Sequence, residues 1–277
     1  MRAFGVIHSA EGSGLSDHVC WIYDDRSEFV VSAVAFLAEG LRLSQRLLYV
    51  GDLDQTRLAR DLGGLGDVDA LLASGQLSIA SVASTYAGTS AHDWSDQHEV
   101  YASLTEAALA DGYTGLRVAA DATALVATTG ALDAFARYEH VVDHLCANGL
   151  PFAAMCGYGA AGTGRDGADE LASIHPLSHG GALPFALFAI ENRRIALVGE
   201  VDALVADAFR TVLGRAMPVA STVEIDCSGL AFIDHAGLSM LDRLATSSRS
   251  CVVLDGGPAV LRRLLDLMQL RAVVAAR

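Results

Sequence analysis

The chain has 277 residues, of which 52% are hydrophobic, and a net charge of −14. This length allows two domains, each with its own core. Residues 1–183 contain nine arginines and 23 acidic residues, which account for the whole net charge, whereas residues 184–277 are neutral. An acidic surface repels phosphate backbones and anionic lipids, and no basic stripe is present, so we predict neither a nucleic-acid nor a membrane partner.

All 19 basic residues are arginine. The absence of lysine excludes a Walker lysine on a nucleotide phosphate, a Schiff base and a Ser–Lys catalytic pair. Five cysteines, an odd number with no CxxC pair, favour free thiols in a reducing compartment. Charged residues interrupt every apolar run, and the first residues do not resemble a secretory signal, so we expect a cytoplasmic protein.

The N-terminal part alternates between strand and helix patterns. Buried strands are expected at 18–23, 46–52, 76–82, 115–121 and 151–156, and helices within 24–41, 96–112 and 130–149. Asp25 followed by Glu28 predicts a capping box at the first helix. The pattern predicts an α/β fold with a parallel sheet covered on both faces, a Gly-rich loop at 157–169 and an interdomain connection at 175–184.

Two motifs in this part have competing interpretations. Gly157, Gly159 and Gly162 spell GxGxxG after a strand, but the helix, strand and acidic residue of a dinucleotide site do not follow, so we favour a flexible loop. A second set contains His18, Cys20, Cys156 and His175. Zinc needs about four such ligands in tetrahedral geometry, and nothing in the spacing demands it. We therefore interpret these residues as core packing, and predict no metal and no cofactor.

Several segments, in order, resemble the MEDS sensory domain of methanogen and methylotroph regulators: "HVCWIYDDRSEFVVSAVAFLAEGLRLSQRLLYVGD", "ASGQLSIASVASTY", "DGYTGLRVAAD", "YEHVVDHL", "CGY" and "HP". The resemblance implies a degenerate RecA/KaiC-like sheet domain without a phosphate loop. Consistently, "HVCWIYDDRSEF" lacks glycine and lysine, and Asp24 and Asp25 oppose phosphate. Asp121 falls near a Walker-B position, but ATP hydrolysis is not expected. Ligand-binding positions implied by the resemblance are His18, Cys20, Tyr23, Tyr138, Glu139, Cys156, Tyr158 and His175.

The pattern changes near Pro184, so we place the domains at 1–183 and 184–277. Two strands around an "ENR" turn are followed by a helix at 202–216, a strand at 221–228, a helix at 236–248, a strand at 250–256 and a helix at 258–268. With "GEVD" (199–202) and "DCSGLAFIDHAGL" (226–238), this order resembles a STAS domain, a smaller α/β fold of anti-sigma-factor antagonists.

The STAS resemblance implies a protein partner, either an anti-sigma factor or a serine kinase with an ATPase fold. Antagonists carry a regulatory serine at the start of a helix, and Ala236 occupies that position here. We do not expect Ser239 or His235 to replace it. Partner-binding positions implied by the resemblance are Gly199, Glu200, Asp202, Asp234, His235, Ala236, Gly237 and Ser239.

The leading hypothesis is a non-enzymatic signalling regulator, in which a sensory domain with a small-molecule ligand is coupled to a STAS domain. One alternative is a small-molecule-binding or metal-binding enzyme that uses the Cys/His set or Asp121. Another is a structural STAS component of a stress-signalling complex, in which the chain forms homo-oligomers.

Overall fold

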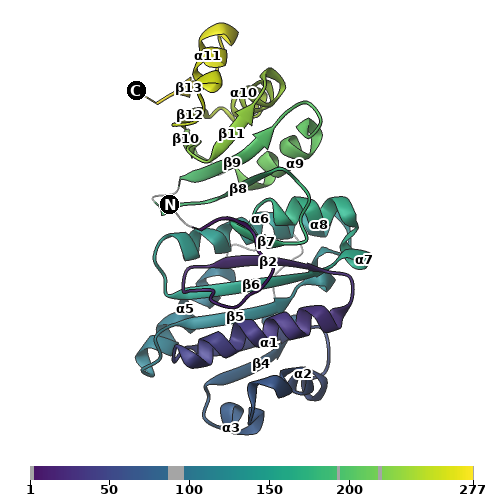
Figure 1. The fold of residues 1–277 in the computed structure, drawn as a ribbon. Helices are drawn as coiled ribbons and strands as arrows, with labels where there is room; N and C mark the ends of the chain where they lie inside the picture. Colours follow the sequence, from purple (N-terminus) through teal and green to yellow (C-terminus); the bar gives the residue numbers. More distant parts are fainter. Residues whose placement is uncertain (1–2, 87–96, 192–193, 218–219, 277) are drawn as a thin grey trace.

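The computed structural model describes residues 3–86, 97–191, 194–217 and 220–276 of the chain. It contains two α/β domains, one placed at the end of the other (Figure 1). The N-terminal domain is built on a parallel sheet and the C-terminal domain on a smaller mixed sheet, which confirms the predicted fold class. None of the helices in the described ranges is long and apolar enough to cross a membrane.

The N-terminal sheet has seven parallel strands in the order β1-β7-β2-β6-β5-β3-β4. The central strands are buried along their whole length, as expected for a parallel sheet covered on both faces. Their bounds are β1 Gly5–Val6, β2 His18–Tyr23, β3 Arg46–Gly51, β4 Leu77–Ser81, β5 Leu116–Asp121, β6 Phe152–Gly159 and β7 Leu177–His179.

Helices cover the two faces of this sheet with two separate sets of apolar residues. The helix α1 (Arg26–Arg42) packs Phe29 and Phe36 against one face, and α6 (Thr129–Ala147) packs Leu132 and Phe135 against the other. The remaining helical elements are α2 Gln55–Asp61, η1 Leu62–Leu65, α3 Val68–Ala73, α4 Val82–Thr85, α5 Gln97–Ala110, η2 Thr123–Val126, α7 Ala160–Thr163 and α8 Arg165–Ala172.

The C-terminal sheet has the order β11-β9-β10-β12-β13, with β8 antiparallel to β9. Its strands are β8 Phe185–Ala189, β9 Ile195–Val201, β10 Thr222–Asp226, β11 Leu230–Ile233, β12 Cys251–Asp255 and β13 Val273–Ala275. Its helices are α9 Ala206–Ala216, α10 His235–Ser248 and α11 Ala259–Met268. Asn192 and Arg193 of the predicted "ENR" turn lie outside the described residues.

The two domains share one hydrophobic core on the α6 face of the first sheet. In Figure 1, α6 and α8 lie between the N-terminal sheet and β8, and α6 contacts both β8 and α9. Polar contacts reinforce the junction, because the Leu187 N–H donates to the Ser173 carbonyl at 2.7 Å. Arg215 of α9 reaches Asp133 of α6 at 2.5 Å and Glu170 of α8 at 2.6 Å.

Three sequence predictions are wrong in detail. Asp25 caps α1, but its side chain accepts from the Ser27 N–H at 2.8 Å, so no reciprocal capping box forms with Glu28. The expected loop at 157–169 is instead the end of β6 followed by α7 and α8. Within the expected connection at 175–184, β7 pairs with β1 and β2 and belongs to the sheet. Both predictions relied on glycine and proline, which are typical of loops. They failed because local composition does not show that α7 and α8 form, or that β7 pairs with β1 and β2.

Candidate functional site

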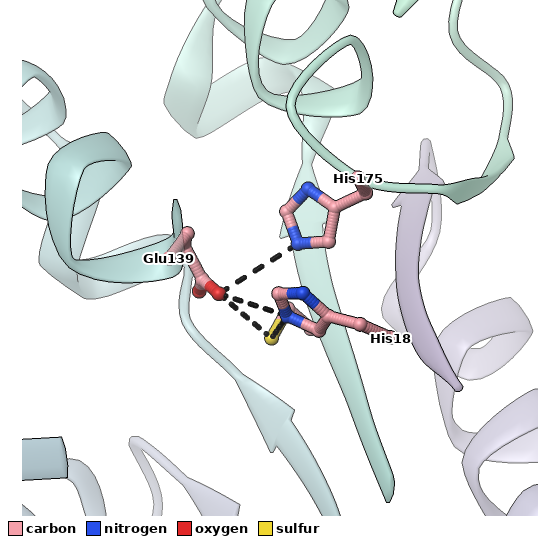
Figure 2. Close-up of side chains that lie close together, drawn as sticks. His18, Glu139 and His175 are labelled. Carbon is pink, nitrogen blue, oxygen red and sulfur yellow. Dashed lines mark hydrogen bonds and ion pairs between the residues drawn. The ribbon is translucent and has the colours of Figure 1, made fainter. Parts of the chain in front are cut away.

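A buried group of polar side chains lies on the α6 face of the N-terminal sheet. Side chains alternate between the two faces of a strand, so His18 and Cys20 of β2, like Cys156 and Tyr158 of β6, point toward α6. From α6, Glu139 approaches this group. His175, in the turn between α8 and β7, completes it, and Figure 2 shows the two imidazoles and the Cys156 sulfur converging on the Glu139 carboxylate.

His18 lies between two carboxylates of α6. Its Nε2 is 3.1 Å from Oε2 of Glu139, and its Nδ1 is 3.3 Å from Oδ1 of Asp143. Residues four apart lie on the same side of a helix, which is why Glu139 and Asp143 reach the same imidazole. All three side chains are buried. The pair therefore holds the His18 ring in one orientation.

Glu139 is the common partner of the group. Its Oε1 accepts a hydrogen bond of 2.7 Å from the Tyr158 hydroxyl. Its Oε2 lies 3.4 Å from the Cys156 sulfur and 3.6 Å from Nε2 of His175. His175 Nδ1 lies 2.8 Å from the backbone carbonyl of Leu171, whereas its Nε2, directed at Glu139, has no hydrogen-bond partner among the described residues.

Burial and pairing shift the pKa values of these groups in different directions. Burial alone lowers the pKa of His18, but its hydrogen bonds with Asp143 and Glu139 outweigh burial and raise it. Burial alone raises the pKa of Glu139, but its interactions with His175 and His18 lower it well below the usual range. Burial lowers the pKa of His175 and, together with the charge of Glu139, raises that of Cys156. The group thus brings two imidazoles, a carboxylate and a thiol together in one buried space.

A different polar network occupies the carboxyl end of the sheet, where a nucleotide phosphate would lie in an ATPase. The Tyr23 hydroxyl donates to Oδ1 of Asp121 at 2.9 Å. The guanidinium of Arg26 lies 3.4 Å from Asp121 and 2.7 Å from Asp61. The Asp25 carboxylate caps the first turn of α1. Side chains of this chain therefore already bind Asp121 and the helix N-terminus.

In the C-terminal domain, the N-terminus of α10 lies beside the end of β9. Oδ1 of Asp234 accepts from the N–H groups of Ala236 at 2.8 Å and Gly237 at 3.0 Å, which makes Asp234 the N-cap. The Asp234 N–H donates to the Val201 carbonyl, and a Cβ on Gly237 would lie 2.8 Å from a Val201 methyl. The "GEVD" and "DHAGL" segments thus form one surface.

Comparison with known families agrees with this arrangement. The model of the MEDS family, the methanogen/methylotroph DcmR sensory domain, matches residues 17–176. This chain belongs to the MEDS family. The model of an Mlab-type STAS domain matches residues 188–275, so a STAS domain follows the MEDS domain. Together the two matches indicate a signalling regulator. A search of curated proteins finds no match to the chain.

The structure brings together five of the eight predicted ligand-binding residues of the MEDS domain: His18, Glu139, Cys156, Tyr158 and His175. Cys20 pairs in register with Cys156 on the neighbouring strand but is outside the group of four converging ligand atoms. Tyr138 packs against Tyr86 and Phe135 beside the group. Tyr23 lies on the opposite face of the sheet, with Asp121.

Sequence reasoning missed three residues at the MEDS site. Asp143 supports His18, and the signal for it was available, because Glu139 and Asp143 are four residues apart on an amphipathic helix. Tyr86 and Tyr101, whose hydroxyl oxygens lie 3.2 Å apart, line a small pocket beside Glu139 and Cys156. Tyr86 ends the segment "ASGQLSIASVASTY", but the local sequence did not mark either tyrosine as part of this site, since both reach it only through the tertiary fold.

The predicted partner-binding residues of the STAS domain have mixed roles. Glu200 and His235 are exposed, and Asp202 caps the following turn by accepting from the Leu204 N–H at 2.9 Å. The Ser239 hydroxyl donates to the His235 carbonyl at 2.7 Å. Gly199 has a φ of +85°, and a Cβ there would lie 2.1 Å from the Pro184 carbonyl oxygen, so its role in this structure is a backbone one.

Proposed function

We propose that the chain is a non-enzymatic signalling regulator, in which the MEDS domain senses a small molecule and the STAS domain binds an anti-sigma factor or an ATPase-fold serine kinase. The observation that carries the proposal is the N-terminus of α10. Asp234 caps Ala236 and Gly237 there, while a methyl group stands where the antagonist family has a hydroxyl. The chain thus retains the capped N-terminus of α10 that a partner would contact, but lacks the hydroxyl group that would accept a phosphate there.

The surface around this helix start supports protein binding. Leu204, two residues after "GEVD", is 92% exposed, and Phe232, paired in register with Glu200, is 41% exposed. Large apolar side chains beside charged ones are typical of protein-binding surfaces. An added phosphate or carboxylate at Ala236 would place negative charge within this surface and oppose docking.

The domain junction supports control by ligand rather than by phosphate. The MEDS and STAS domains share one core, and α6, which carries Glu139, contacts β8 and α9. Oδ2 of Asp143 accepts from the Ala189 N–H at 2.6 Å, and Oδ1 of the same carboxylate faces His18. A change in the position of His18 or Asp143 at the buried MEDS site would therefore directly affect the hydrogen bond to β8 of the STAS sheet.

The non-enzymatic part of the proposal rests on the occupied carboxyl end of the MEDS sheet. Asp121, the nearest counterpart of a Walker-B carboxylate, is bound by Tyr23, Thr123 and Arg26. Lysine, which commonly binds the nucleotide phosphates, is missing from the sequence. Hydrogen bonds from Tyr23 and Thr123 and the ion pair with Arg26 thus hold this carboxylate in place.

The test is a binding titration of the full chain with ATPase-fold anti-sigma proteins encoded in the same genome. We expect one of them to bind, Ala236→Asp to weaken binding at least tenfold, and Ala236→Ser to accept phosphate from ATP when that partner is a kinase. Ser247→Asp, on an exposed position near the other end of α10, serves as the matched control and should bind as the wild type does. Unchanged affinity of Ala236→Asp would place the interface elsewhere.

A further inference from the structure

We propose that His18, Glu139, Cys156 and His175 bind a single zinc ion inside the MEDS domain. Each residue offers one ligand atom, and the four ligand atoms all lie within 4.8 Å of one another. Two imidazole nitrogens, a sulfur and a carboxylate oxygen form a donor set that suits zinc, which binds Cys, His and Glu in tetrahedral sites. The site does not depend on the signalling role proposed above.

The spacing of the ligand atoms fits a tetrahedral ion. Zinc bonds of about 2.0–2.3 Å place neighbouring ligand atoms roughly 3.3–3.6 Å apart. Oε2 of Glu139 lies 3.1 Å from Nε2 of His18, 3.4 Å from the Cys156 sulfur and 3.6 Å from Nε2 of His175. The Cys156 sulfur lies 3.6 Å from Nε2 of His18. The other two pairs lie within 4.8 Å, so His175 has to move toward His18 and Cys156 to complete a tetrahedron.

Both histidines are held in the orientation that a metal ligand needs. His175 donates from Nδ1 to the Leu171 carbonyl at 2.8 Å, which leaves the Nε2 lone pair directed into the group. His18 places Nδ1 3.3 Å from Asp143 and turns Nε2 toward the same centre. Metal-binding histidines almost always donate their other ring N–H to a carbonyl or carboxylate in this way.

Core packing alone explains this group poorly. The Nε2 atom of His175 is buried and has no hydrogen-bond partner among the described residues, which is costly unless something occupies the space it faces. Glu139 and Asp143 place two buried carboxylates around His18. Burying charge is unfavourable unless it is paired or coordinates a metal, and a divalent cation at this point supplies both the missing partner and the charge.

Two pockets of very different size lie beside the group. His175 also lines a pocket of about 290 Å³ at the domain junction, bordered by Phe185 and Gly199 of the STAS domain. On the other side, the pocket beside Glu139 and Cys156 measures only about 10 Å³, close to the space one water molecule needs. The proposed ion therefore lies between a closed interior and a pocket at the domain junction.

Binding requires deprotonation but no change of oxidation state. The Cys156 thiol loses its proton to solvent as its sulfur donates an electron pair to the zinc. A protonated His18 likewise releases its Nε2 proton, so that His18 and His175 both bind through neutral Nε2 atoms. Glu139 contributes one carboxylate oxygen, while its other oxygen keeps the hydrogen bond from the Tyr158 hydroxyl.

The test uses the full chain, stripped with a chelator and then titrated with Co²⁺ and Zn²⁺. We expect one equivalent of Co²⁺ to give the intense visible bands of a tetrahedral complex and a thiolate-to-cobalt charge-transfer band, and one equivalent of Zn²⁺ to abolish both. Zn²⁺ at 100 times its dissociation constant should also raise the unfolding temperature, because it binds only the folded chain. A wild-type chain without a stoichiometric charge-transfer band would overturn the proposal.

Variants separate this site from adventitious binding. Cys156→Ser should lose the charge-transfer band, and Glu139→Gln, which keeps the size of the side chain, should bind Zn²⁺ at least tenfold more weakly. Cys20→Ser is the matched control, because Cys20 is the register partner of Cys156 but is not one of the four ligands. If Cys156→Ser does not fold, loss of the band in Cys20→Ser, or full Zn²⁺ affinity in Glu139→Gln, still contradicts the proposed ligand set.

Discussion

The carboxylate of Asp143 in the MEDS domain accepts a hydrogen bond of 2.6 Å from the backbone N–H of Ala189 in the STAS domain. Its other oxygen lies 3.3 Å from Nδ1 of His18. One buried side chain thus joins the polar group of the first domain to the first strand of the second. The link connects the proposed sensor to the proposed partner-binding domain without a mobile linker.

Replacing this link should weaken the whole molecule. Asp143→Ala leaves the Ala189 N–H without this acceptor in a buried position, so we expect the free energy of unfolding to fall by about 1–3 kcal/mol. Urea denaturation of the full chain, with midpoint and slope fitted together, measures the change. Glu106→Ala, on an exposed position of α5, is the control and should stay within about 0.5 kcal/mol. An equal loss in both variants would contradict a specific role for Asp143.

Arg215 is the second connection between the domains. Its side chain is 4% exposed and contacts Asp133 and Glu170, which are 47% and 17% exposed. Arg215→Met keeps much of the packing but leaves Glu170 largely buried without this cation, so we expect a loss of about 2 kcal/mol in the free energy of unfolding. Asp133 is half exposed and water can solvate it, which limits the cost.

Arg210→Met on the same helix is the control for Arg215. The pair of Arg210 and Asp207 is exposed, at 64% and 91%, and such pairs contribute less than about 1 kcal/mol. Thermal unfolding of both variants should therefore show a clear decrease for Arg215→Met and almost none for Arg210→Met. Equal melting temperatures for the two variants would mean that the ion pairs of Arg215 do not stabilise the junction measurably.

Much of the fold could be predicted from the sequence because the signals were local. Buried apolar runs at 18–23 and 115–121 marked strands, and apolar residues at helical spacing within 24–41 marked a helix. The short strands β7, β11 and β13 could not be found in this way, since they have three or four residues and exist only through pairing with neighbours. Edge pairing is a tertiary property.

The candidate site was predictable in part. His18 and Cys156 stood out as polar residues in buried strands. Side chains alternate between the two faces along a strand, so His18 and Tyr23, an odd number of positions apart, lie on opposite faces of the sheet. The partner of His18 was harder to assign, because the spacing of Glu139 and Asp143 on α6 becomes informative only when α6 is placed over β2. Convergence of the four ligand atoms needed the structure.

Replacing two glycines of the STAS domain with alanine should change the free energy of unfolding in opposite directions. Gly199 has a φ of +85°, and a Cβ there would lie 2.1 Å from the Pro184 carbonyl oxygen, which is backbone and cannot move aside easily. Gly199→Ala should cost about 2–4 kcal/mol through strain and overpacking. Gly214, inside α9, has no heavy atom within 4 Å of a Cβ, so Gly214→Ala should stabilise by about 0.5–1 kcal/mol.

Denaturant titration measures both glycine variants. The comparison also bears on the interpretation of "GEVD", since Gly199 was predicted from the family resemblance to bind a partner. If the affinity of Gly199→Ala for the partner falls only in proportion to the fraction of protein that is unfolded, the role of Gly199 is a backbone one. A larger fall in affinity, in protein that remains fully folded, would restore a role for Gly199 at the interface.

The five cysteines should differ sharply in reactivity. Cys20, Cys146, Cys156 and Cys227 are buried, whereas Cys251 at the start of β12 is partly exposed. Burial raises the pKa of the Cys227 thiol to about 12 and also raises the pKa values of Cys20 and Cys156, so these three groups form little thiolate near neutral pH. Titration of the native chain with a thiol reagent should modify about one thiol rapidly, and all five after unfolding.

The variant Cys251→Ser should abolish the rapid phase. Rapid modification of Cys156 in the native chain would contradict the prediction, because it would mean that the polar group opens to solvent far more often than its burial indicates.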